Sequence, residues 1–237
     1  MRSAFDFVPA GPALPQVINV IVEIPKGKRS KFEVCKKTGL IKLDRYLYSA
    51  SHYPGDYGYI PQTLSEDGDP LDAIVMVNEP TFPGCLIEAR PLGLFRMLDK
   101  GDNDFKVLCV PSRDPIFAEY DTLNRVPPHF LREVEHFFST YKQLEGGDVV
   151  SKGWDDRSAA YEEILLCVRR YREADATAVA EANAKSKRHK EIGPLPALKL
   201  DDHAPATKPV RKPVSMADSK VAPKTAPKSV KKTAKKK

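Results

Sequence analysis

The feature that most constrains this chain is an acidic turn, Ser65–Asp72, that leads directly into a short apolar run. The turn reads SEDGDPLD, so Asp67, Asp69 and Asp72 lie within six residues. Its glycine frees the backbone, and its proline fixes one φ angle. The run that follows, 73–77, has the composition of a buried strand. Three carboxylates held this close repel one another, and a hard divalent cation such as Mg²⁺ or Mn²⁺ would relieve that repulsion.

Two other interpretations of the turn have to be weighed. Its aspartates can instead cap backbone groups of an ordinary polar turn. A calcium-binding loop fails on spacing, because the fifth position counted from Asp67 is Leu71 and the twelfth is Asn78. Such a loop needs an oxygen ligand and a bidentate glutamate at these places. The turn alone therefore leaves the cap and the cation site open.

Charge is distributed unevenly along the chain. Residues 201–237 hold ten Lys and one Arg against three Asp, a net charge of +8, so residues 1–200 carry about −2 of the chain's +6. Large apolar residues nearly vanish after Leu200, and such a segment cannot bury enough surface to fold. The predicted domains are an arm at 1–15, a folded domain at 16–185 and a disordered tail, rich in Lys, Ala and Pro, at 186–237. The tail either binds nucleic acid or other polyanions without sequence preference, or stays solvated.

The cysteines and the hydropathy indicate a compartment. The four cysteines lie in or beside apolar runs and show no paired metal-ligand spacing: Cys35, Cys85, Cys109 and Cys167. This pattern is typical of buried free thiols in a reducing cytosol. No signal-peptide core opens the sequence, and no apolar run approaches the ~20 residues that span a bilayer. We therefore expect a soluble cytoplasmic protein without membrane contact.

Strands are predicted before the acidic turn. Residues 16–25 form an apolar strand in which Glu23 is either an edge residue facing water or a site carboxylate. Residues 31–35 alternate polar and apolar and predict a half-exposed strand, with 40–47 as its hairpin partner. The stretch 52–61 carries three tyrosines and predicts a rigid aromatic loop. Its hydroxyls can bind phosphate oxygens, or its rings can pack in the core.

A second acidic turn follows the first. Residues 85–97 predict a long strand, bent at Pro91 or Gly93, and the next strand begins at about Val107. Between the two strands lie three carboxylates and a lysine, Asp99, Asp102, Asp104 and Lys106. One acidic turn is a weak indication, whereas two of them with basic residues and tyrosines nearby suit several metal ions that hold a polyanion.

Two helices are predicted in the second half of the folded domain. Residues 127–145 follow helical spacing, with prolines at the start and a glycine pair at the end. Lys142 in the last turn is either a favourable C-terminal cation or a ligand-binding residue. A second helix runs from about 156 past 171, and its alanine-rich continuation, 174–184, can bury little.

In this order the motifs resemble those of family I soluble inorganic pyrophosphatases, over about residues 15–172. They are Glu23 in VIVEIP, Lys31-Phe-Glu33, Asp44-Arg45, YPGDYGY at 53–59, DGDPLD at 67–72, Asp99 to Lys106, and Tyr141-Lys142. The resemblance implies a mainly β fold with flanking helices (α+β), in which two main helices pack on a small, highly twisted five-stranded β-barrel of OB-like form. It also implies Mg²⁺-dependent hydrolysis of inorganic pyrophosphate by a cytoplasmic homo-oligomer, with a hexamer favoured.

The resemblance further implies roles for single residues. Asp67, Asp72 and Asp104 would bind the first metal, Asp72 would also hold the second, and Asp99 and Asp104, with Glu23 nearby, would serve metals that arrive with substrate. The catalytic residues would be Asp69, Asp67 and Tyr57, with Asp69 orienting or deprotonating the attacking water. Phosphate oxygens would contact Lys31, Arg45, Tyr57, Lys106, Tyr141 and Lys142, supported by Glu33 and Tyr53. Lys100 is a departure, because some members carry an acid there.

The chemistry agrees with these implied roles. Two metal ions can lower the pKa of a shared water and stabilise both the attacking and the leaving oxygen, so that the remaining need is positioning and charge neutralisation. No P-loop is present, so a nucleotide cradle is not indicated. The alternative hypothesis is a polyanion- or nucleic-acid-binding protein that acts through its basic tail on an inactive pyrophosphatase-like barrel.

Overall fold

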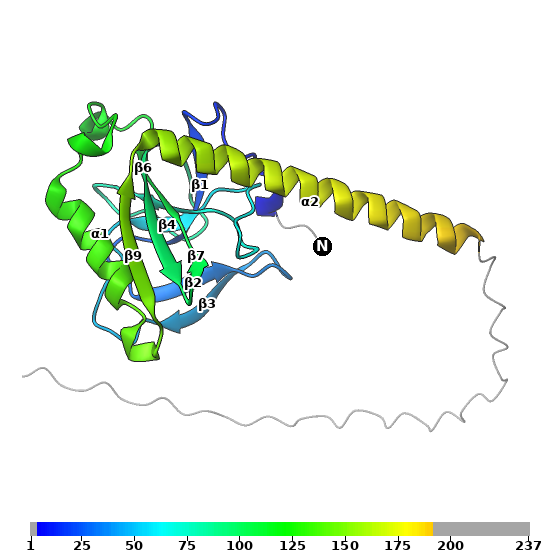
Figure 1. Cartoon of the computed structure of the whole chain (residues 1–237), viewed down its shortest axis with the longest axis horizontal. Helices are drawn as coiled ribbons and strands as arrows, with labels where there is room; N and C mark the ends of the chain where they lie inside the picture. The colour runs from blue at the N-terminus through cyan, green and yellow to red at the C-terminus, as the bar shows by residue number, and fades with distance from the viewer. Residues whose placement is uncertain (1–3, 192–237) are drawn as a thin grey trace, which may run out of the picture. The chain divides into compact units, whose positions relative to one another are not determined.

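Five strands close into a barrel in this protein, whose computed structural model describes residues 4–191 (Figure 1). The strands are β1 (Ile18–Ile24), β2 (Ser30–Val34), β3 (Ile41–Tyr46), β4 (Asp56–Tyr59), β5 (Asp72–Val75), β6 (Leu86–Asp99), β7 (Asp102–Asn103), β8 (Lys106–Pro111) and β9 (Val149–Asp155). The α-helices are α1 (Pro128–Thr140) and α2 (Arg157–Glu191), and the 3-10 turns are η1 (Ala4–Phe7), η2 (Pro115–Phe117), η3 (Leu123–Arg125) and η4 (Gln143–Glu145). Most of the predicted tail lies outside the described residues.

The barrel closes because β6 pairs on both sides. Its strands follow the order β1, β4, β5, β8 and β6, and β6 returns to β1 in antiparallel register. The pair of β5 and β8 is parallel, and the other pairs of the ring are antiparallel. Closure leaves none of these strands as a free edge. The predicted five-stranded barrel with two main helices is confirmed, and β2 and β3 form a separate hairpin sheet.

The long strand β6 bends where the sequence predicted. Its register with β8 shifts between Pro91 and Gly93. A Cβ atom at Gly93 would lie 2.5 Å from the Leu123 side chain and 2.7 Å from the Asp155 carbonyl oxygen. The bend therefore needs a residue without a side chain, and it lets β6 serve the barrel while its far end pairs with β7 and β9.

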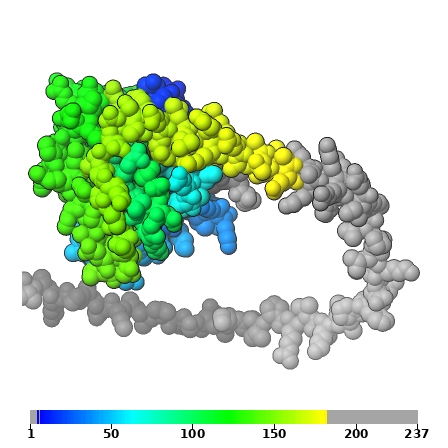
Figure 2. Space-filling model, in the orientation of Figure 1, coloured from blue at the N-terminus to red at the C-terminus, as the bar shows by residue number. Residues whose placement is uncertain are grey.

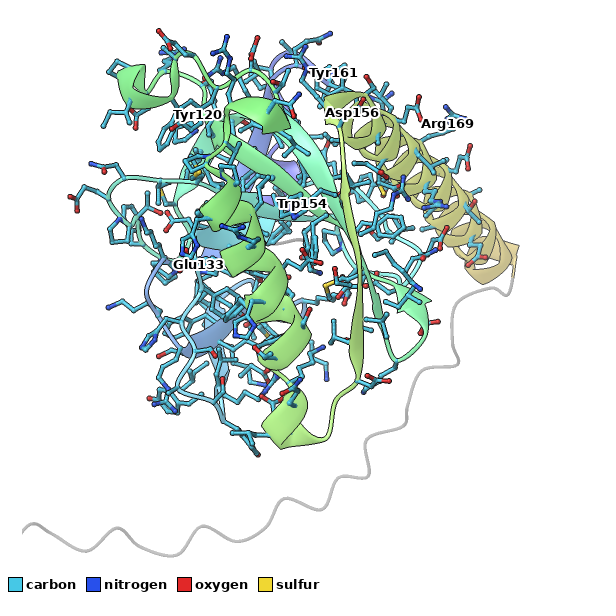
Figure 3. All side chains as sticks on the ribbon, turned by 60° about the vertical axis from the view of Figure 1, so that its left-hand side comes forward. Tyr120, Glu133, Trp154, Asp156, Tyr161 and Arg169 are labelled. Atoms are coloured by element: carbon cyan, nitrogen blue, oxygen red, sulfur yellow. The ribbon has the colours of Figure 1, made fainter. Side chains whose placement is uncertain are left out.

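Two apolar clusters fill the fold, one under each helix. On α1, Val134, Phe137 and Phe138 are buried, at the helical spacing that the sequence shows. On α2, Ile164 and Val168 are buried among barrel residues. Figure 3 shows α1, which carries Glu133, beside β9, which carries Trp154. The helices thus hold the strands from two sides.

Only the first part of α2 packs on the barrel. Ile164 and Val168 are buried, whereas from Arg172 to Glu181 every side chain except that of Asp175 is exposed. The helix continues past the other elements in Figures 1 and 2. The prediction that 174–184 is helical with little burial is therefore confirmed for 174–181, the part whose side chains are described.

Two segments differ from the sequence-based predictions. The helix expected over 127–145 ends at Thr140, because Lys142 leaves the helical path and its carbonyl accepts hydrogen bonds from the N–H groups of Glu145 and Gly147. Part of the expected aromatic loop is strand β4, which pairs with β1 and β5.

The thiol prediction is only partly right. All four cysteines are free; Cys109 and Cys167 are buried, but Cys35 and Cys85 are only half-buried. Within the described part of the chain, no helix is both long enough and apolar enough to cross a membrane.

Gly58 makes the closest backbone approach in the barrel and provides a stability prediction. A Cβ atom there would lie 1.9 Å from the Ile21 carbonyl oxygen and 2.8 Å from the Val22 Cα atom, both in the paired strand β1. We expect Gly58→Ala to lower the free energy of unfolding by roughly 3 kcal/mol in urea denaturation. Gly27→Ala, which has open space but a φ of +76°, should cost only about 1 kcal/mol. An equal cost for the two variants would contradict this packing.

Candidate active site

Strand pairing brings the two acidic turns together at one end of the barrel. In the parallel pair of β5 and β8, Asp72 lies directly opposite Lys106. Asp72 begins β5 at the end of the first acidic turn, and Lys106 begins β8 at the end of the second. Tyr57 comes from β4, the other neighbour of β5. The barrel therefore places residues from three separate motifs side by side.

Lys106 is the centre of this group. Its side chain is 1 % exposed, and its ammonium donates to Asp72 at 2.6 Å and also to Asp104. Burial alone would lower the pKa of Lys106, but the two carboxylates outweigh burial and hold the pKa above its ordinary value. The Tyr57 hydroxyl donates to the same oxygen of Asp72. One cation thus neutralises two carboxylates that belong to different turns.

Burial, together with repulsion from neighbouring carboxylates, raises the pKa values of two aspartates of the site. Burial raises the pKa of Asp72, and the nearby Asp104 adds repulsion. Asp67 is exposed overall, yet partial loss of hydration raises the pKa of its carboxyl group, and Asp104 and Asp69 repel it further. The positive charge of Lys106 therefore does not fully offset burial and repulsion at these two aspartates.

The capping interpretation of the first turn also describes a real contact. Oδ1 of Asp67 accepts a hydrogen bond from the backbone N–H of Asp69 at 2.9 Å. Asp69 itself points to the β2–β3 hairpin, where Lys36 Nζ forms an ion pair with it. Both side chains are more than half exposed, so Asp69 is open to solvent as well.

Glu23 is half-buried next to the first acidic turn, which favours the site interpretation over an edge residue facing water. It lies at the irregularity between Val22 and Ile24, where β1 pairs with β4. Oε1 of Glu23 accepts a hydrogen bond from the Val34 N–H at 2.7 Å. Burial raises the pKa of Glu23 to about 7, and Asp72 contributes repulsion.

That pKa predicts how the metal-free protein responds to pH. Because the pKa of Glu23 is about 7 in the folded protein and 4.5 ordinarily, the folded state binds more protons between these values. Stability should be fully present below about pH 5 and fall as pH rises to 8, by about 3 kcal/mol from this group. Urea unfolding in EDTA at both pH values measures it. Glu23→Gln, which keeps the acceptor for Val34, should flatten the dependence; an unchanged slope in the variant would contradict it.

The basic residues form ion pairs around the same end. Lys142 pairs with Asp99, and Lys31 pairs with Glu33 and, at 3.3 Å, with Asp44. The two rings of Tyr53 and Tyr141 pack on Phe137, with centroid distances of 4.7 and 5.3 Å, and both tyrosines are buried. The rings therefore serve the core, as one of the two interpretations of the tyrosines proposed.

Arg45 belongs to a cluster that the sequence did not reveal completely. Its guanidinium pairs with Asp44 at 2.5 Å and with Glu145 at 2.8 Å. Glu145 lies in η4, a hundred residues further along the chain, and Lys36 contacts Asp69 from the turn between β2 and β3. Neither residue stands in a motif, so no sequence signal marked them.

The donor set fits a divalent cation in its chemistry. Every candidate ligand offers carboxylate oxygens, which hard cations prefer. Oδ1 of Asp99 is buried and has no hydrogen-bond partner, although Oδ2 pairs with Lys142. Within residues 4–191, no three His, Cys, Asp or Glu side chains converge closely enough to form a metal cluster. The carboxylates of Asp72, Asp104 and Asp99 instead form ion pairs with lysines at this end of the barrel.

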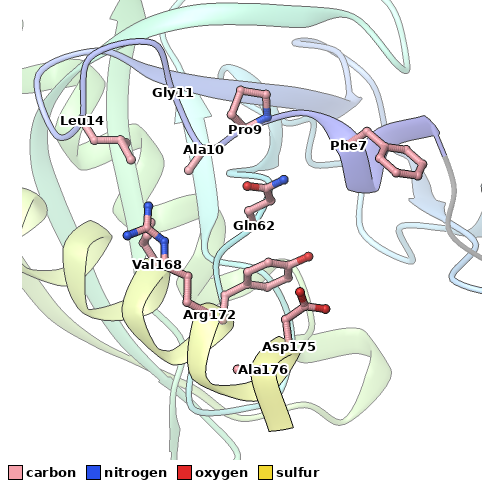
Figure 4. A pocket seen from close by; sticks show the side chains of 11 residues that line it. Phe7, Pro9, Ala10, Gly11, Leu14, Gln62, Val168, Arg172, Asp175 and Ala176 are labelled. Carbon is pink, nitrogen blue, oxygen red and sulfur yellow. The ribbon is translucent and has the colours of Figure 1, made fainter. Parts of the chain in front are cut away.

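A separate pocket lies between the N-terminal segment and α2 (Figure 4). It has a volume of about 440 Å³, and its wall includes Phe7, Gln62 and Arg172. None of the predicted site residues lines it. The candidate site is therefore the charged end of the barrel and not this pocket.

A closed barrel that gathers carboxylates and amines at one end defines a protein suited to binding cations and compact polyanions together. The chain matches the family model described as inorganic pyrophosphatase over residues 20–172. The inorganic pyrophosphatase of Methanosarcina acetivorans is 50 % identical over 158 residues, which cover 67 % of this chain and 94 % of the relative. That of Halalkalibacterium halodurans is 48 % identical over 67 % of this chain and 97 % of its own.

Solved structures agree with these relatives. The crystal structure of inorganic pyrophosphatase from Thermus thermophilus superposes with a TM-score of 0.70 at 42 % identity, covering 72 % of this chain and 99 % of that one. An inorganic pyrophosphatase from Coxiella burnetii gives a TM-score of 0.67 at 37 % identity, over 69 % and 99 % of the two chains. The chain belongs to the family I soluble inorganic pyrophosphatases.

Proposed function

We propose that this protein hydrolyses inorganic pyrophosphate to two phosphates, with Mg²⁺ as its metal. The observation that carries the proposal is the group around Lys106, a buried ammonium between Asp72 and Asp104 with the Tyr57 hydroxyl beside it. Such a site offers oxygens to cations and N–H groups to phosphate within a few ångströms. Membership of the pyrophosphatase family supports the same reaction.

The carboxylates at the barrel end are the proposed metal ligands. They are Asp67, Asp72 and Asp104 for the activating ions, with Asp99 and Glu23 for ions that arrive with substrate. Bound divalent cations would supply a lowered pKa for the attacking water and charge stabilisation on the phosphoryl oxygens. The free, buried oxygen of Asp99 and the raised pKa values of Asp67 and Asp72 support this assignment.

The other side chains would bind substrate and move a proton. Asp69, which is exposed next to the turn, would accept a proton from the attacking water. The water oxygen forms a bond to one phosphorus atom, the bridging P–O bond breaks, and its electron pair leaves with the second phosphate. Phosphate oxygens would be held by Lys31, Arg45, Tyr57, Lys106, Tyr141 and Lys142, while Glu33 and Tyr53 support them. Lys106 would exchange a carboxylate partner for phosphate as cations take over the carboxylates.

Substrate choice tests this proposal. Purified protein with Mg²⁺ should release phosphate from pyrophosphate, and release from ATP or a phosphomonoester at the same concentration should be far slower, because the paired charges suit a small polyanion. Equal rates on all three substrates would contradict a site built for pyrophosphate.

The basic tail supports a second function. Residues 201–237 carry a net charge of +8 and lie beyond the family match, which ends at residue 172. A segment of this charge would bind nucleic acid or another polyanion by counterion release. A gel-shift comparison of the full chain with a truncation to 1–191 separates the functions; if the full chain shifts no nucleic acid at low salt, this role is excluded.

We also propose a cytoplasmic homo-oligomer, with a hexamer favoured. The four cysteines are free thiols, as a reducing compartment keeps them. Several large apolar side chains are exposed, including Phe82 at 65 % and Leu86 at 49 %, and a second copy would cover such surface. Light scattering on the eluting protein measures the mass of the assembly directly, and a monomer at micromolar concentration would contradict the proposal.

A further inference from the structure

Glu66, which precedes Asp67 in the first acidic turn, joins three elements of the fold. Its Oε2 accepts a hydrogen bond from Asn103 Nδ2 at 2.9 Å, and its Oε1 accepts one from Arg170 Nη2 at 2.9 Å. Asn103 lies in the second acidic turn, directly before Asp104, and Arg170 lies on α2. Each carboxylate oxygen of Glu66 therefore has its own partner on a different element.

The same face of α2 holds the base of the first turn at a second point. The Leu64 N–H donates to the Cys167 carbonyl oxygen at 3.0 Å, and the Ser65 hydroxyl lies 3.7 Å from the Cys167 sulfur atom. Cys167 and Arg170 are three residues apart, so they face the same side of the helix. This part of α2 is anchored in the core by Ile164 and Val168. The first acidic turn therefore contacts α2 at two places, through Glu66 with Arg170 and through Leu64 with Cys167.

The contact between the two turns opposes an electrostatic force. Asp67 follows Glu66 and Asp104 follows Asn103, so the contact lies directly beside two carboxylates of like charge, which repel each other. Lys106 already bridges the two turns, and the contact of Glu66 with Asn103 adds a second link directly beside Asp67. The bond from Asn103 to Glu66 holds the neighbouring residues together.

We propose that Glu66, Asn103 and Arg170 are positioning residues that hold the two acidic turns at the spacing a divalent cation needs. None of the three touches the reacting atoms. The inference rests on the proposed function, because it assumes that Asp67 and Asp104 share a cation. Beyond that function, it assigns to Glu66 a link between the proposed metal ligands and helix α2.

The expected effect is on metal affinity and not on the chemical step. Glu66→Ala removes both contacts and should raise the dissociation constant for Mg²⁺ or Mn²⁺ by roughly three- to tenfold, a modest loss because Glu66 and Arg170 are 51 % and 29 % exposed. Glu66→Gln keeps the Asn103 contact and should fall between the wild type and Glu66→Ala. Glu162→Ala removes an exposed acid of α2 and should change nothing.

Calorimetric titration of the full-length protein with Mn²⁺, without substrate, measures the affinity, and phosphate release at saturating Mg²⁺ measures the turnover. We expect weaker binding in Glu66→Ala, with turnover within about twofold of the wild type. Unchanged affinity in Glu66→Ala, with an unchanged melting temperature, would overturn the inference while the wild type stays active. A wild type that neither binds metal nor releases phosphate would overturn the proposed function itself, and this inference with it.

Discussion

Asp72→Asn should lower the rate of pyrophosphate hydrolysis by roughly 1,000-fold at saturating Mg²⁺. Asparagine has nearly the same shape, so the loss comes from the charge. Asp72 is the acceptor for both Lys106 and Tyr57 and is the proposed ligand shared by two cations. Removing its charge weakens metal binding and leaves the Lys106 ammonium with Asp104 alone. Asp69→Asn removes the proposed proton acceptor and should lower the rate of hydrolysis by a similar factor.

Stability separates this effect from unfolding. Burial and Asp104 raise the pKa of Asp72, so its charge is unfavourable in the metal-free fold. Asp72→Asn should therefore unfold at the same urea concentration as the wild type, or a higher one, in EDTA. Asp102→Asn is the matched control, because Asp102 is exposed in the second turn and has no proposed role. It should keep most of the activity, and full activity in Asp72→Asn would contradict the role assigned to Asp72.

Lys106→Met should reduce both activity and stability. The variant leaves Asp72 and Asp104 close together without their buried partner, and breaking a buried ion pair on one side typically costs about 3–5 kcal/mol. Hydrolysis should also fall by roughly 100-fold or more, because a donor to phosphate is lost. Urea unfolding at pH 8 in EDTA measures the first effect and phosphate release measures the second.

Added Mg²⁺ should restore part of the stability of Lys106→Met. A cation bound by the two carboxylates replaces the missing positive charge, and a ligand that binds only the folded state stabilises it. Lys152→Met, at an exposed position of β9, controls for loss of a lysine and should behave like the wild type. Wild-type stability of Lys106→Met in EDTA would contradict the view that Lys106 holds the two acidic turns together.

Much of the fold could be predicted because its signals are local. The apolar runs located β1, β5 and β8, and Pro91 and Gly93 marked the bend of β6. The boundary of α1 could not be predicted, because it depends on how Lys142 leaves the helix to reach Asp99. Likewise, the environment of Glu23 was open until its contacts with Val34 and Asp72, which are distant in the sequence, were known.

The site divides in the same way. Asp67, Asp72 and Lys106 belong to motifs whose spacing is visible in the sequence. The partners of these motifs are set by tertiary contacts between residues far apart in the chain. Arg170 reaches Glu66 across 104 positions, for example, and one arginine among several on a predicted helix carries no signal for such a contact. Sequence patterns therefore identified the charged groups, and only the fold identified what holds them.

The most direct test of the central claim is phosphate release from pyrophosphate by the purified full-length protein, measured with Mg²⁺ and again with excess EDTA. We predict fast release with Mg²⁺, two phosphates for each pyrophosphate consumed, and no release with EDTA. Release that EDTA leaves unchanged would contradict a metal-dependent site. No release under either condition, from protein that is folded by circular dichroism, would mean that the barrel keeps these residues without the chemistry, and the binding function of the tail would then lead.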